Sequence, residues 1–125
     1  MFDKLKIGSS AKASQKFTPI HPNPDIGKSH GISLLLHGKH SEEYRNAIAG
    51  TIRRSKRREL TIDESIEESV RVIVSCCTGW EGITDDDGKT VKYDGKKLSD
   101  ILINDDYRWL RLQAEQFMAQ DDNFF

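Results

Sequence analysis

The pattern of hydrophobic positions predicts a small β element near the amino terminus. Residues 31–37 are mostly apolar, which is typical of a buried β-strand, and Gly38 and Lys39 follow as a turn. Residues 16–20 precede this strand across a proline-rich loop, and we expect them to be its antiparallel partner. Because proline fixes φ and lacks a backbone donor, residues 1–30 are expected to be a flexible or extended arm and not a helix.

Two amphipathic helices are expected in the middle of the chain. Ser41 is a favourable N-cap for the first helix, whose apolar stripe is Tyr44, Ala47, Ile48, Thr51 and Ile52. Thr61 and Glu64 have the spacing of a capping box for the second helix, whose inner face would be Ile62, Ile66, Val70, Val72, Ile73, Val74, Cys76 and Cys77. We expect Gly79 to end this helix, because glycine takes the left-handed conformation at low cost.

The last third of the chain predicts a surface loop and two further helices. Four glycines and the Asp85-Asp86-Asp87 run make residues 79–95 typical of turns. Asp94 is expected to cap a short helix, and Asp105 or Asp106 to cap the last one. The inner stripe of the last helix would be Tyr107, Leu110, Ala114, Phe117 and Met118, with Trp109 and Leu112 on another side.

These elements predict a mainly α, α+β fold. A small N-terminal β-hairpin or extended arm at residues 1–30 would lead into about four helices, and residues 31–125 would form one compact domain. A chain of 125 residues leaves no room for a second core of useful size. The last two residues, Phe124 and Phe125, either fold back over the core or await a partner.

Composition and charge restrict the location and the partners of the chain. Nineteen basic and 20 acidic residues give a net charge of −1, which argues against nucleic acid or membrane binding through the overall field. Residues 1–78 carry 13 basic and 9 acidic side chains, whereas residues 79–125 carry 6 and 11. No apolar run approaches a bilayer span and no signal-peptide pattern opens the chain, so we expect a cytoplasmic protein. The adjacent Cys76 and Cys77 are too close for an ordinary disulfide and fit a reducing compartment as buried thiols.

The densest charge feature is a run of five basic residues in six positions: Arg53, Arg54, Lys56, Arg57 and Arg58. Basic side chains near a helix C-terminus are favoured by the helix dipole, so a solvated helix end is the first interpretation. An acidic protein partner is the second and nucleic acid the third. No aromatic residue is interleaved with the run, which argues against a platform for stacked bases.

Catalytic and metal-binding motifs are not found in the sequence. If Gly88 is aligned with the glycine of an EF-hand loop, Ile83 and Asp94 would take its first and last ligand positions, which does not suit calcium. The His37-x-x-His40 pair has no nearby residues to complete a zinc site. No glycine-rich phosphate loop or nucleophile elbow is present. We therefore expect no enzyme, no metal and no cofactor.

Residues 78–88, which read Thr-Gly-Trp-Glu-Gly-Ile-Thr-Asp-Asp-Asp-Gly, begin an ordered series of features. Tyr93-Asp94, a short apolar helix, an amphipathic helix and a final Asn123-Phe124 follow. This series resembles the carboxyl half of the tail assembly chaperones of long-tailed bacteriophages, and residues 38–45 resemble that family's strand-to-helix junction. The likeness covers about residues 32–125, with Val91-Lys92-Tyr93-Asp94 in place of the family's usual Pro-Phe-Ser.

The resemblance implies a non-enzymatic role in the cytoplasm of an infected bacterium. Such a chaperone binds the tape measure protein while the tail tube protein polymerises around it, and it is absent from the mature virion. The chain would be the short, non-frameshifted form of a protein made in two lengths. The candidate partner-binding residues are Trp80, Trp109, Arg53, Arg54, Lys56, Arg57, Arg58, Phe124 and Phe125, and for each tryptophan a place in the core is the competing interpretation.

Two other functions stay open on the sequence. One is a small nucleic-acid-binding regulator that uses residues 53–58, and the other is a structural tail or head-completion subunit that stays in the particle. Self-association is a further open question, and no membrane partner is expected.

Overall fold

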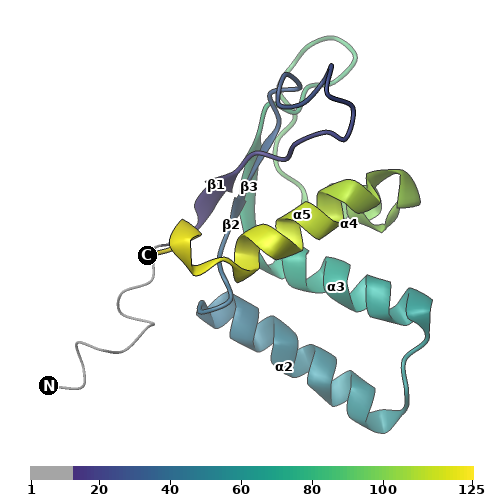
Figure 1. Cartoon of the computed structure of the whole chain (residues 1–125). Helices are drawn as coiled ribbons and strands as arrows, with labels where there is room; N and C mark the ends of the chain where they lie inside the picture. The colour runs from purple at the N-terminus through teal and green to yellow at the C-terminus, as the bar shows by residue number, and fades with distance from the viewer. Residues whose placement is uncertain (1–12) are drawn as a thin grey trace, which may run out of the picture.

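A computed structural model describes residues 13–125, and Figure 1 shows a small sheet beside a group of helices. Within the described residues the fold is mainly α, with a three-stranded antiparallel sheet. The elements in chain order are β1 (Gln15–Phe17), β2 (Ser33–Leu36), α2 (Glu42–Arg57), α3 (Ile62–Cys76), β3 (Cys77–Glu81), α4 (Gly95–Ile103), the 3-10 turn η2 (Asp105–Tyr107), α5 (Arg108–Ala119) and the 3-10 turn η3 (Asp121–Asn123).

The predicted pairing of the first two strands is confirmed. β1 and β2 are antiparallel, with Lys16 opposite Leu35, and together they form a hairpin closed by a long loop. The strands are shorter than the sequence pattern predicts, since residues 18–20, 31–32 and 37 lie outside them. The sequence predicted either a hairpin or an extended arm at residues 1–30, and residues 13–30 contribute to a hairpin. Residues 1–12 of the predicted arm lie outside the described residues.

The expectation that Gly79 ends a helix and opens a loop is wrong. α3 ends at Cys76, and the chain passes directly into β3, where Gly79 pairs with Leu35 of β2. The left-handed conformation belongs to Gly82, whose φ is +80°, one residue beyond β3. The pairing of β3 with β2 joins residues more than 40 positions apart, so no local pattern indicates it.

The helix starts follow the predicted caps in three of four cases. Ser41 Oγ accepts the Tyr44 amide at 3.1 Å, and Asp94 Oδ1 accepts the Lys96 amide at 2.9 Å. Thr61 and Glu64 form the reciprocal capping box. The cap expected at Asp105 or Asp106 is wrong, because Asn104 Oδ1 accepts the Asp106 amide and begins η2 instead.

The core lies between the inner face of the sheet and helices α3, α4 and α5. Its least exposed side chains include Leu34, Leu36, Ile73, Leu98, Leu102 and Ala114. Three predicted inner positions are exposed, namely Ile52 (48%), Ile62 (82%) and Tyr107 (41%). Within α2, residues 42–57, Gly50 alone is fully buried, because this helix packs at the margin of the fold against α3.

Candidate functional site

An apolar groove lies between the loop that joins β1 to β2 and the helices α4 and α5. It has a volume of about 500 Å³. Its floor is Leu34, Leu98 and Leu110, and its sides include Ile26, Ile32, Ile83, Ile101, Tyr107 and Trp109. These side chains come from four separate segments, so the groove exists only in the folded chain. We call this site the apolar groove.

One wall of the apolar groove is held in place by two histidines. His30 Nδ1 accepts the Ile32 amide at 2.9 Å, and its Nε2 lies 2.8 Å from the Pro19 carbonyl oxygen, to which it donates. His21 Nδ1 accepts the Asn23 amide at 3.0 Å. Because Nδ1 accepts in both rings, the proton of each neutral imidazole is placed on Nε2. The loop is therefore preorganised beside the groove.

Trp109 forms part of the opposite wall. It lies in the first turn of α5 and is partly buried, with its ring against the His21 ring at a centroid separation of 4.9 Å and an angle of 63°. Tyr107 and Ile26 beside it are 41% and 37% exposed. The structure thus places one predicted anchor, Trp109, at an open apolar surface.

Sequence reasoning did not identify the loop residues of the groove as candidate site residues, because they show no periodic pattern. Ile32 falls in the segment predicted as a strand, whereas Ile26 and Ile83 are isolated apolar residues between prolines, glycines and polar side chains. Their presence in otherwise polar turns was the available signal.

Trp80 is placed away from the apolar groove and fixes a turn. Its indole Nε1 donates to the Val91 carbonyl at 2.8 Å, and its ring meets the edge of Tyr93 at a centroid separation of 5.1 Å. Leu34 is its cross-strand neighbour in β2. Trp80 therefore holds the segment before α4 against the sheet.

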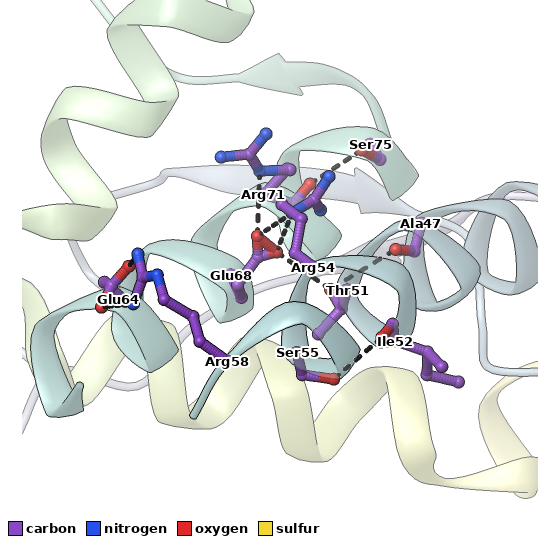
Figure 2. A network of polar contacts seen from close by, with 10 residues as sticks. All are labelled: Ala47, Thr51, Ile52, Arg54, Ser55, Arg58, Glu64, Glu68, Arg71 and Ser75. Atoms are coloured by element: carbon purple, nitrogen blue, oxygen red, sulfur yellow. Dashed lines mark hydrogen bonds and ion pairs between the residues drawn. The ribbon is translucent and has the colours of Figure 1, made fainter. Parts of the chain in front are cut away.

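The basic run at the end of α2 is partly used inside the fold. Figure 2 shows Arg54 and Arg71 reaching the carboxylate of Glu68, which is 6% exposed. Arg54 Nε donates to Glu68 Oε2 at 2.9 Å, and Thr51 Oγ1 donates to the same oxygen at 3.2 Å. The Arg54 hydrogen bond lowers the pKa of Glu68 despite its burial. This network joins α2 to α3.

A second arginine of the run, Arg58, pairs with Glu64 at the start of α3. Arg58 Nη1 lies 2.8 Å from Glu64 Oε1, and the Thr61 amide donates to the same carboxylate. These contacts, the Arg58 hydrogen bond first, lower the pKa of Glu64 to about 2. The side chains of the run without an ion pair to any of residues 13–125 are then Arg53, Lys56 and Arg57. Two of the five basic side chains of the run are therefore used inside the fold.

The two terminal phenylalanines have different environments. Phe124 is 3% exposed, and its ring packs on Phe117 at a centroid separation of 5.5 Å. It also covers Gly38, where a Cβ atom would lie 2.6 Å from the Phe124 ring. Phe125 is 43% exposed and lies against His40. Of the two alternatives for the tail, Phe124 folds back over the core, and Phe125 alone presents its ring to solvent.

The remaining reactive side chains are held in structural roles. Cys76 and Cys77 are both buried, and burial raises the pKa of Cys76 to about 12 and also raises the pKa of Cys77. Asp85 Oδ1 accepts the amides of Asp87 and Lys89 at 2.9 Å, so this carboxylate closes its own turn. Within residues 13–125 no three potential metal ligands come together.

The described part of the chain has no helix that could cross a membrane. None of these helices has the length and apolar character that a bilayer crossing requires.

Comparison with known proteins found no family model, no curated protein and no solved structure that matches the chain. Its function must therefore be inferred from its own residues and geometry.

Proposed function

We propose that this chain is a non-enzymatic binding protein that holds a helix of another polypeptide in its apolar groove. The observation that carries the proposal is the groove itself. It has a volume of about 500 Å³, and Trp109 and Tyr107 are among the side chains that line it. Aromatic side chains contribute large apolar area at little entropic cost, and they dominate binding energy in such grooves. The proposed function is binding alone, and it requires no covalent reaction at the apolar groove.

The charged residue that lines the apolar groove favours a partner with a basic group beside its apolar stripe. Asp106 is the one residue with a formal charge among the described residues that line it. Opposite charges around an apolar centre fix the orientation of a bound helix more than they add affinity.

The partner that we propose is the tape measure protein of a long-tailed bacteriophage, with the chain acting as a tail assembly chaperone. The Thr78–Gly88 segment and the Asn-Phe ending support this assignment through their resemblance to that family. The order of β3, acidic loop, capped α4, α5 and a tail that folds back is compatible with it. The chaperone would act in the host cytoplasm during tail tube assembly and would leave before the virion is complete.

Co-expression with the tape measure protein of the same phage tests the proposal. We expect the chain to raise the soluble fraction of the tape measure protein, and Trp109→Ala to reduce this effect. Leu112→Ala is the matched control, because Leu112 lies on the same helix, is 48% exposed and is outside the groove. If the tape measure protein is equally insoluble with and without the chain, the chaperone function is wrong.

The two other functions predict different results with the same material. A structural tail or head-completion subunit would be found in regular copy number in purified virions by mass spectrometry, whereas a chaperone would be absent. A nucleic-acid-binding regulator would bind DNA or RNA at low salt and lose affinity steeply as salt increases. Either result would exclude the chaperone function and support the corresponding alternative.

A further inference from the structure

β1 is an edge strand of the sheet, and within residues 13–125 no strand pairs with its outer side. The strand order is β1-β2-β3, and Figure 1 places β1 at the outer margin of the sheet. Beside β1 lies a second groove, of about 830 Å³, between β1, the following loop and α5. We call this the edge groove.

Glutamine amides from α5 line the edge groove. Gln113 Nε2 donates to the Ile20 carbonyl at 2.7 Å, and Gln113 Oε1 accepts the Ile20 amide at 2.7 Å. This side chain therefore bonds a backbone amide and carbonyl together, as a neighbouring β-strand does. Gln116 and Gln120 lie on the same side of the groove at positions i+3 and i+7. They offer donors and acceptors for an extended backbone placed there.

Among the described residues, two charged side chains line the edge groove, and both are basic: Lys16 and Lys28. Lys16 Nζ is 2.9 Å from Glu81 Oε2, yet its side chain remains 59% exposed. A second copy of this chain is a poor occupant, because antiparallel pairing of two β1 strands about their centres would bring Lys16 close to its own counterpart. Lysine at an edge disfavours such self-pairing, and like charges on facing strands are destabilising.

We propose that the edge groove binds an extended, acidic segment of another polypeptide as an added β-strand. Backbone hydrogen bonds to β1 and to the amides of Gln116 and Gln120 supply the pairing, because the Gln113 amide is already bonded to Ile20. Lys28 selects acidic side chains, and an acidic ligand competes with Glu81 for Lys16, whose exposed ion pair is weak. This surface differs from the apolar groove, although His21 contributes to both. The inference does not depend on the identity of the partner proposed for the apolar groove.

Fluorescence anisotropy with the full chain tests the inference directly. The probe is a fluorescein-labelled eight-residue peptide that alternates glutamate and valine. One control peptide replaces glutamate with lysine, and another places prolines at alternate positions to remove backbone donors. We expect the glutamate peptide to bind and both controls to bind at least about tenfold more weakly, equivalent to about 1.4 kcal/mol. Equal binding of the three peptides would overturn the inference.

Charge reversal and mapping complete the test. Lys16→Glu combined with Lys28→Glu should abolish selectivity for the glutamate peptide, while the matched control Lys96→Glu with Lys97→Glu on α4 should retain it. Circular dichroism verifies that both variants fold. In ¹⁵N-resolved NMR spectra we expect the peptide to shift the amides of residues 15–18 and 20. Shifts confined to other residues, or a dimer of the unliganded chain that uses β1, would refute the inference.

Discussion

Replacement of Phe124 by alanine offers a sharp test of how the carboxyl terminus is packed. Phe124 is 3% exposed, whereas the adjacent Phe125 is 43% exposed, so the two positions form an internal control. The tail around Phe124 is also fixed by polar contacts. Asn123 Nδ2 donates to the Phe117 carbonyl at 2.9 Å, and His40 Nε2 lies 3.0 Å from Asp121 Oδ1.

The size of the expected effect follows from the burial of the ring. Full burial of a phenylalanine side chain is worth about 1.5–3 kcal/mol, and loss of a core phenylalanine costs about 3–5 kcal/mol where a cavity remains. Because Phe124 follows a short 3-10 turn and is not part of a helix or strand, the backbone around it can relax and limit the cavity. We expect Phe124→Ala to reduce the free energy of unfolding by about 2–3 kcal/mol. Phe125→Ala should change it by no more than about 0.5 kcal/mol.

Urea unfolding followed by circular dichroism measures both changes, with an unaltered m-value as the check on two-state behaviour. Gly38→Ala gives an independent test of the same contact, because its Cβ would lie 2.6 Å from the Phe124 ring. Its cost should fall to within about 0.5 kcal/mol of zero in the Phe124→Ala background. Equal costs at Phe124 and Phe125, or an additive Gly38→Ala penalty, would show that the terminal ring does not pack as described.

Three further predictions concern the rest of the fold. Because the hydrogen bonds from Arg58 and Arg54 lower the pKa of Glu64 and of Glu68, the stabilisation from each carboxylate is complete above the ordinary carboxyl pKa. It is lost as the pH falls through the lowered pKa, which for Glu64 is about 2. Acid titration of stability should therefore be flatter for the double variant Glu64→Gln/Glu68→Gln than for the unaltered chain. Gly82→Ala should cost at least about 2 kcal/mol in urea unfolding, because φ is +80° and the Gly31 carbonyl oxygen lies 2.0 Å from the position that the new methyl group would take. Cys76 and Cys77 should react with a thiol reagent only as fast as the chain opens, and rapid modification of the folded protein would contradict their burial.

Local signals in the sequence were sufficient for most helix starts and for the helical faces near the core. The caps at Ser41, Thr61 and Asp94 depend on hydrogen bonds between residues two or three positions apart. Residue type and spacing therefore determine them before any tertiary contact forms. The failure at Asp105 has the same local character, because Asn104 one residue earlier is an equally good cap and takes that position in the folded chain.

The basic run shows where local patterns stop being informative. The sequence indicates five basic side chains and a helix end, but it does not say which of them meet carboxylates. Arg54 and Arg58 find Glu68 and Glu64 only because α2 and α3 pack together. The side chains left for a partner are correspondingly fewer than the charge density alone suggests.

By itself, the sequence determined the mainly helical class, the first hairpin and the buried character of the cysteines. Tertiary structure alone decided that residues 77–81 form a strand, that Phe124 is buried beside an exposed Phe125, and which loop residues line the two grooves. These features depend on contacts such as Gln113 with Ile20, which joins residues 93 positions apart. Periodicity and capping report the conformation of neighbouring residues, whereas a groove is made where distant segments meet, and the free energy that brings them together comes from burial of the shared core.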